Sequence, residues 1–173
     1  MDYTLAQYLA PQYEMLAFNL VKQRLLMLGY PASVADLQYD IDFPIRGLFV
    51  DRKYGNFLKV DTFGQILGCV HGRMKLSKEE TQERYPSMMI HQDEIGKRFY
   101  LLDTLFALPM ASLLAALIDL LEATEGKKAD GEGIAGKNVT LDFHTLFDDV
   151  QGAVDWVHQQ GTLKKVLVAC ANV

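Results

Sequence analysis

A stripe of polar side chains near the end of the sequence has the spacing of one helix face. At steps of three, four and three residues it contains Asp148, Gln151, Asp155 and His158. Side chains at these intervals lie together on a helix. The usual meaning of such a face is solvated surface, although a carboxylate and an imidazole three residues apart could also supply two ligands to a metal site. The third interpretation is one wall of a ligand pocket.

The glycine-rich stretch TEGKKADGEGIAGKNVT contains the beginning of a phosphate-binding loop. Residues 131–137 read G-x-x-x-x-G-K. In such loops an apolar strand leads in, and the Lys is followed by a Ser or Thr that ligates Mg²⁺. Here the lead-in is polar and Asn138 stands at the hydroxyl position. The sequence therefore indicates a flexible surface loop at about 124–141 rather than a nucleotide site.

The other histidines and the cysteines indicate no site of their own. His71 and His91 have no Cys or Asp at metal-ligand spacing, which favours surface or hydrogen-bonded histidines. Cys69 and Cys170 are too few for a disulfide framework, and no basic and apolar signal segment opens the sequence. These features indicate a reducing compartment, and we predict a cytoplasmic protein.

Hydrophobic periodicity predicts the first helix and a small sheet. Apolar residues three and four positions apart predict a helix over 14–28, which Gly29 ends. Between residues 46 and 71, short apolar runs are separated by the turn signals KYG and TFG. This pattern predicts an antiparallel meander of three strands.

Two further helices are predicted in the second half of the chain, at about 109–122 and 143–159. Gly126 and Gly161 follow them at positions typical of residues just past a helix C-terminus. The apolar stripe of the second of these helices predicts a core face, opposite the polar stripe. Together with the meander, these helices give a predicted α+β fold.

Composition excludes two classes of partner. The 173 residues are 50% hydrophobic, which predicts one domain with its own core. With 22 Asp and Glu against 17 Lys and Arg, no global positive field exists to hold nucleic acid or an anionic membrane. The most apolar run, Ala111–Leu121, has 11 residues and includes Asp119. It is shorter than the roughly 20 residues that cross a bilayer, so it predicts a buried helix.

Four stretches match one family in order and separation: MDYTLAQY, FPIRGLFVDRKYGNFLKVD, RFYLLDTLFALP and DVQGAVDWVHQQGTLK. Together they closely resemble the cytosolic purine 5'-nucleotidases of the haloacid dehalogenase superfamily. The resemblance covers nearly the whole chain and fades around residues 127–138 and after Lys165. In that family the opening motif reads D-x-D-Y-T-L, so Asp2 corresponds to the second aspartate and Met1 to the x.

The resemblance implies a division of the chain. Residues 1–8 correspond to a remnant of the family's first motif. Residues 9–173 resemble the cap region of a haloacid-dehalogenase-like α/β hydrolase, whose Rossmann-like core is mostly missing from this sequence. The expected fold is thus a cap-like arrangement of helices with a three-stranded antiparallel meander.

The family chemistry implies a role for Asp2. By resemblance it is the catalytic general acid and base, and its backbone carbonyl is a ligand of Mg²⁺, the implied cofactor; Thr4 steadies the motif loop. The reaction implied is Mg²⁺-dependent hydrolysis of a nucleoside 5'-monophosphate through an aspartyl phosphate. The nucleophilic first aspartate has no counterpart among these residues, so the chain as given is expected to be inactive.

The resemblance also implies substrate-binding residues. Phe106 matches a residue that packs on the base, and Asp155, His158 and Lys164 match positions that line the nucleotide site. Gln151 stands where the purine-selective members carry Arg. The implied substrate is a purine nucleoside 5'-monophosphate. The alternative is a noncatalytic nucleotide-binding or oligomerisation module, since family members assemble as homo-oligomers.

Overall fold

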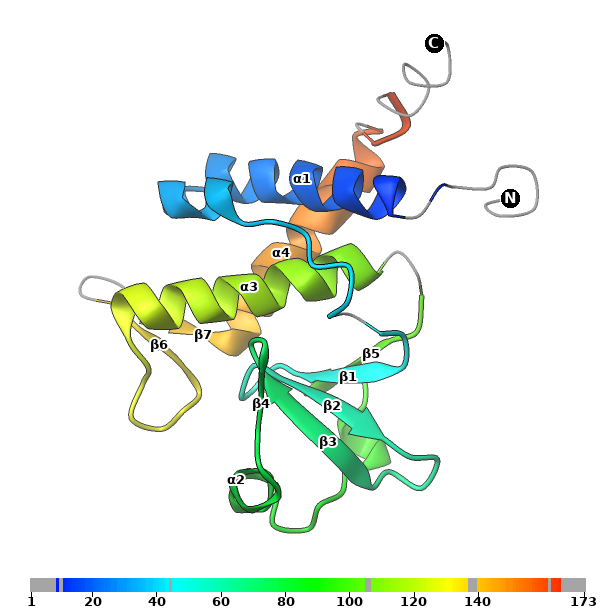
Figure 1. Ribbon diagram of the computed structural model, residues 1–173, viewed down its shortest axis with the longest axis vertical. Helices are drawn as coiled ribbons and strands as arrows, with labels where there is room; N and C mark the ends of the chain where they lie inside the picture. The colour runs from blue at the N-terminus through cyan, green and yellow to red at the C-terminus, as the bar shows by residue number, and fades with distance from the viewer. Residues whose placement is uncertain are drawn as a thin grey trace.

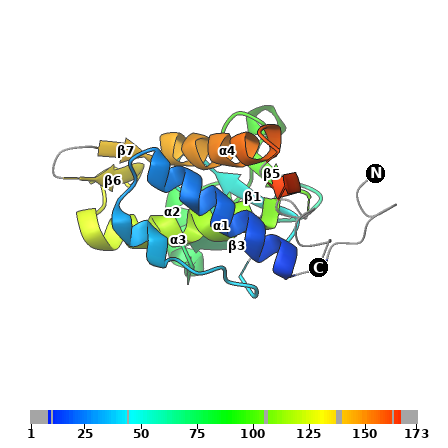
Figure 2. The same ribbon diagram turned by 90° about the horizontal axis from the view of Figure 1, so that it is seen from above.

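The computed structural model describes residues 9, 11–43, 45–104, 107–136, 140–161 and 163–165. A layer of helices lies over an antiparallel sheet, as Figure 1 shows, and the α+β prediction is confirmed. Three helices that contact one another form the layer: α1 (Gln12–Met27), α3 (Ala107–Glu125) and α4 (Phe143–Gln159). Seen from above in Figure 2, α1 and α4 lie side by side, and α3 lies under α1.

The sheet contains the predicted meander and two further strands. Its order is β4-β3-β2-β1-β5, and every pairing is antiparallel. The strands are β1 (Leu48–Asp51), β2 (Asn56–Val60), β3 (Ile66–His71), β4 (Met74–Lys75) and β5 (Phe99–Leu102). The three-stranded meander is thus the centre of a five-stranded sheet. Between the strands lie η1 (Ala32–Asp36), α2 (Lys78–Arg84) and η2 (Gln92–Glu94).

Side chains alternate between the two faces of the sheet along each strand, and both faces are covered. The face toward the helices carries Val50 and its cross-strand partner Phe57, which belong to the main core. On the other face, Leu58 and its partner Cys69 form a second cluster with Tyr85. The sheet therefore lies between the helical layer and the segment around α2.

Helix α4 has the bounds that its hydrophobic spacing predicts. Phe143, Leu146, Phe147, Val150 and Val157 are buried, which confirms the predicted core face. The predicted helix over 14–28 is α1, and glycines with positive φ follow both helices as expected: Gly29 at 99° and Gly161 at 64°.

Helix α3 is longer than the apolar run that predicts it. By length and composition, this 19-residue helix is long and apolar enough to cross a membrane. However, 72% of its most apolar window is buried inside the molecule. Ala111, Leu113 and Leu117 are fully buried between the other helices and the sheet. It is therefore a core helix, as the sequence predicts, although the predicted length was too short.

The segment that the sequence indicates as a flexible loop, at about 124–141, contains a hairpin. Strands β6 (Gly133–Ala135) and β7 (Thr140–Asp142) pair antiparallel. Ile134 is 3% exposed and joins the main core, which anchors the hairpin to α3. A β-carbon at Gly133 would overlap the Leu141 carbonyl, so this close pairing requires glycine. Burial of one apolar side chain thus organises a segment whose composition is otherwise polar.

A row of hydrogen-bonded side chains, here called the polar chain, connects the two layers. Its members in order are Arg98, Asp51, Tyr85, Asn56, His71, Glu122 and Lys127. At one end, the Arg98 guanidinium donates to both oxygens of Asp51 at 2.9 and 2.8 Å. Asp51 is fully buried and also accepts the Tyr85 hydroxyl at 2.6 Å. Burial, then the Asp51 carboxylate, raises the pKa of Tyr85.

The donors and acceptors of the polar chain follow one another in a fixed direction. Because the single Tyr85 proton goes to Asp51, the Tyr85 oxygen accepts from Asn56 Nδ2 at 2.9 Å. Asn56 Oδ1 therefore faces His71 Nδ1 at 2.7 Å and accepts from it. His71 Nε2 lies 2.8 Å from Glu122 Oε1. His71 thus forms a hydrogen bond at each ring nitrogen and links the sheet to α3.

Replacing Glu122 with Gln is expected to give a pH-dependent loss of stability. Burial acts to raise the pKa of Glu122, but hydrogen bonds from His71 and Lys127 outweigh it, and the pKa lies below its ordinary 4.5. A depressed folded-state pKa contributes stability that is present above the unfolded value and is lost as pH falls through the folded value. The difference in unfolding free energy between wild type and Glu122→Gln should therefore be largest near neutral pH and shrink below about pH 4.5.

Urea unfolding at a series of pH values measures this difference. Glu79→Gln, in the first turn of α2 and exposed, is the control for removing one carboxylate. A Glu122→Gln penalty that stays constant from pH 7 to pH 3 would contradict the expectation.

Candidate active site

The residues of the predicted site divide into two groups. Asp2, Thr4 and Phe106 lie outside the described residues. Gln151, Asp155, His158 and Lys164 lie within them, on α4 and just after it. The structure can therefore place the side chains expected to line the nucleotide, while the opening motif remains a prediction from sequence.

The polar stripe forms one face of α4, opposite the core residues. Gln151 Nε2 donates to Asp155 Oδ1 at 3.1 Å, one helical turn away. Asp155 is exposed and Gln151 is half-buried. Inside this face, Gln151 Oε1 is buried and has no hydrogen-bond partner in the part of the chain that the structure describes. A buried acceptor without a donor is uncommon in folded proteins and marks this part of the face as unusual.

Arg52, immediately after β1, belongs to the same face. Its Nη1 donates to Asp148 Oδ1 at 3.3 Å, and Asp148 lies one turn before Gln151 on α4. The guanidinium lies 5.4 Å from the centre of the Phe147 ring, a cation–π contact. Among the described residues no acceptor partners Arg52 Nε, which is buried. Arg52 thus adds a donor without a partner to the face on which Gln151 has an acceptor without a partner.

His158 and Lys164 do not join this cluster. The His158 Nδ1 donates to the Val154 carbonyl oxygen at 2.8 Å, which turns the ring back onto its own helix. Lys164 is exposed beyond the end of α4. Both side chains are exposed, and among the described residues no hydrogen bond or ion pair joins either of them to Gln151 or Asp155.

The described residues do not form a metal centre. Within the described ranges no group of three or more His, Cys, Asp or Glu side chains has the arrangement to hold a metal ion. Asp155 and His158 therefore have no third ligand of these types beside them in the described part of the chain. Of the residues expected to hold Mg²⁺, Asp2 lies outside the described part.

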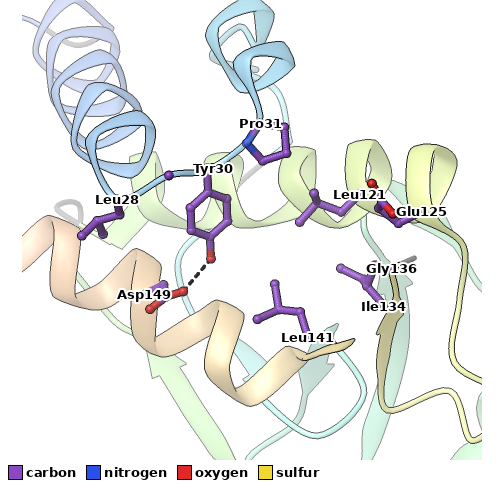
Figure 3. A pocket seen from close by; sticks show the side chains of 10 residues that line it. Leu28, Tyr30, Pro31, Leu121, Glu125, Ile134, Gly136, Leu141 and Asp149 are labelled. Carbon is purple, nitrogen blue, oxygen red and sulfur yellow. Dashed lines mark hydrogen bonds between the residues drawn. The ribbon is translucent and has the colours of Figure 1, made fainter. Parts of the chain in front are cut away.

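Another face of α4 lines a cavity of about 440 Å³, shown in Figure 3. It lies between the α1–η1 turn, the end of α3, the β6–β7 hairpin and α4. The Tyr30 hydroxyl donates to Asp149 Oδ2 at 2.7 Å across one side. Burial, then this hydrogen bond, raises the pKa of Tyr30 above its ordinary range. Leu121, Ile134 and Leu141 supply an apolar wall.

The charge of this cavity is wrong for a phosphate ester. Its charged lining residues in the described part of the chain are the carboxylates Asp149 and Glu125. Carboxylates repel a dianionic phosphate, and an apolar wall does not solvate it. The polar face of α4 with Arg52 is therefore the better candidate for a nucleotide site.

A model of the 5'-nucleotidase family matches residues 1–172, which is almost the full length. The chain belongs to the 5'-nucleotidase family. This finding confirms, at the level of the family, the resemblance in the four sequence stretches.

Curated relatives carry the same family designation. The chain is 30% identical over 171 residues to a 5'-nucleotidase domain-containing protein of Dictyostelium discoideum, covering 97% of the chain and 27% of that protein. It is 31% identical over 130 residues to human 5'-nucleotidase domain-containing protein 1, covering 70% of the chain and 29% of the human protein. The chain is 31% identical over 138 residues to the bovine protein of the same name, covering 74% of the chain and 30% of the bovine protein. This 5'-nucleotidase chain thus spans less than a third of these relatives.

Sequence reasoning about the site missed Arg52. It lies about a hundred residues before α4 and belongs to no periodic pattern with the polar stripe. The available signal was its position directly after a predicted strand, in FVDRKYGN, because strand ends commonly carry functional side chains at a sheet edge.

Proposed function

We propose that the chain forms the nucleotide-binding part of an enzyme that hydrolyses nucleoside 5'-monophosphates to nucleoside and phosphate, with purine nucleotides preferred. The family match supports the reaction class. One observation carries the site: α4 and Arg52 combine exposed polar side chains with a buried donor and a buried acceptor that have no partner among the described residues. A cytoplasmic location and assembly as a homo-oligomer are parts of the same proposal.

Each side chain of this face suits one part of a nucleotide. The Arg52 guanidinium can donate to phosphate oxygens, which it matches in charge and geometry. Gln151 can accept from a base or ribose N–H or O–H through Oε1, and Asp155 can accept from ribose hydroxyls. Phe106 is proposed to stack on the base, with His158 and Lys164 at the rim. Recognition then uses charge at one end and stacking at the other.

The chemical step is proposed to use two carboxylates in turn. An aspartate two positions before Asp2 attacks phosphorus, the bond from phosphorus to O5' breaks, and Asp2 gives its proton to that oxygen. Water then attacks the aspartyl phosphate, Asp2 takes the water proton, and phosphate leaves. Mg²⁺, held in part by the Asp2 carbonyl, would supply charge neutralisation when bound.

Hydrolysis is proposed for a protein that supplies this first aspartate together with Asp2. The noncatalytic nucleotide-binding module is the alternative, and it is the behaviour proposed for a polypeptide in which Asp2 is the sole carboxylate of the motif.

Calorimetric titration with inosine 5'-monophosphate tests the site. The Gln151→Leu variant keeps the side-chain size and is expected to weaken binding by roughly 2- to 10-fold, the loss of one hydrogen bond. Arg52→Gln is expected to weaken it by about tenfold or more, because hydrogen bonds to charged groups contribute more. Weaker binding of cytidine 5'-monophosphate than of inosine 5'-monophosphate would support the purine preference.

Gln159→Leu is the matched control, because it makes the same change at an exposed position of the same helix. Equal weakening by Gln151→Leu and Gln159→Leu, or no nucleotide binding at all, would overturn the site. Phosphate release by the 173-residue chain above that of an Asp2→Asn variant would overturn the proposed roles of the two carboxylates.

A further inference from the structure

A second cavity, of about 510 Å³, lies beside the sheet and has the opposite electrostatic character to the cavity of Figure 3. Residues of β2, β3 and β4 line it, together with the segment that enters β1. No described residue of α4 lines it, so it is separate from the proposed nucleotide site.

Three cations gather on this cavity in a chain whose net charge is −5. They are Lys59, Arg73 and Lys75, opposed by Asp42. Lys59 and Lys75 form no ion pair with any carboxylate of the described residues. Arg73 Nε lies 3.9 Å from Asp119 Oδ2, a half-exposed pair that contributes little. The local excess of positive charge is thus free to bind an anion.

An aromatic pair and a glycine give the cavity its shape. The Phe43 and Phe57 rings meet edge to face, with centroids 5.4 Å apart. Gly68 lies opposite Lys59 in the register of β2 and β3, where a side chain would otherwise stand on the same face. A β-carbon there would meet only the Lys59 β-carbon, at 4.0 Å. The missing side chain leaves the hollow between the aromatic wall and the cations.

We propose that this cavity, which we call the basic pocket, binds a small amphipathic anion: a planar ring carrying a carboxylate, sulfonate or phosphate. The ring would lie against Phe43, which packs edge to face on the buried Phe57. The anionic group would lie among Lys59, Arg73 and Lys75, where charge complementarity favours it. The inference is independent of the proposed function, because it uses none of the same residues.

Titration with 1-anilinonaphthalene-8-sulfonate, followed by fluorescence, tests the basic pocket. Gly68→Val fills the hollow with a side chain that strands favour, at a site with room for it, and should abolish the specific binding phase. A Lys59→Gln/Lys75→Gln variant should weaken sulfonate binding by about 5- to 10-fold, the effect of two partly exposed charges. The same variant should bind the neutral analogue N-phenyl-1-naphthylamine as wild type does.

Lys97→Gln, an exposed lysine that does not line the cavity, controls for net charge. Unfolding by urea verifies that each variant is folded. Sulfonate binding that survives Gly68→Val unchanged would overturn the proposal, because the probe would then bind elsewhere.

Competition separates the two parts of the ligand. Phenyl phosphate and benzoate should displace the probe at lower concentrations than inorganic phosphate or benzyl alcohol, and the order of the first two identifies the preferred anionic group. Inorganic phosphate that competes as well as phenyl phosphate would show that the ring contributes nothing and would overturn the proposal. Stronger competition by a glutamate-rich peptide would instead indicate an acidic protein segment as the occupant, which also overturns it.

Discussion

Replacing Arg98 with alanine is expected to lower the free energy of unfolding by about 3–5 kcal/mol, the cost of leaving a buried carboxylate without its charged partner. Asp51 has no exposed surface, and Arg98 meets both of its oxygens. After the substitution, the hydrogen-bond donors that remain to Asp51 among the described residues are the Tyr85 hydroxyl and the Lys53 backbone N–H. Urea unfolding followed by circular dichroism measures the loss.

Arg73→Ala is the matched comparison, since its ion pair with Asp119 is half exposed and 3.9 Å long. We expect it to cost less than about 1 kcal/mol. A double variant, Asp51→Asn with Arg98→Ala, should recover part of the loss because an amide needs no countercharge. If Arg98→Ala costs no more than Arg73→Ala, Asp51 is not the buried anion that the structure describes.

The isosteric change Asn56→Asp is expected to cost about 2–4 kcal/mol at neutral pH, although it alters no volume. Asn56 must donate to the Tyr85 oxygen and accept from His71 at the same time. An ionised carboxylate cannot donate, and the new charge would lie, fully buried, one hydroxyl away from Asp51. The substitution would therefore disrupt the order of donors and acceptors along the polar chain, and not its packing.

The pH dependence identifies this cause. A protonated carboxyl group can donate, so the Asn56→Asp penalty should shrink as the introduced group is protonated in acid. Asn19→Asp, on the exposed side of α1, makes the same chemical change and should alter stability by no more than about 0.5 kcal/mol. Equal effects of the two substitutions would show that Asn56 has no directional role.

Elements that depend on local pattern were predictable from the sequence. Helix α4 starts at Phe143 and ends at Gln159 as predicted because its apolar spacing is regular and Gly161 follows it. The strands of the meander are joined by short turns containing glycine, so their pairing is also local. Helix α2 was not predicted, although its capping box, Ser77 with Glu80, is a recognised start signal.

Elements that depend on distant partners were not predictable in the same way. Strand β5 joins the sheet by pairing with β1, far away in the sequence. The β6–β7 hairpin depends on the burial of Ile134 against distant helices. The polar stripe of the candidate site was visible as a helical period, but Arg52 comes from another element. The polar chain has no sequence pattern at all, since its members come from strands, helices and loops.

The position of α1 and α4 in the chain has a consequence for synthesis. These helices stand near opposite ends of the described chain and pack on each other and on α3, whereas β1 to β4 pair with their immediate neighbours. On a ribosome the hairpins can form early, because closing short loops costs little entropy. The part of α1 that packs on α4 stays uncovered until α4 has emerged, and until then it is a surface for chaperones or for aggregation. We expect the nascent chain to depend most on chaperones when translation stalls between α3 and α4.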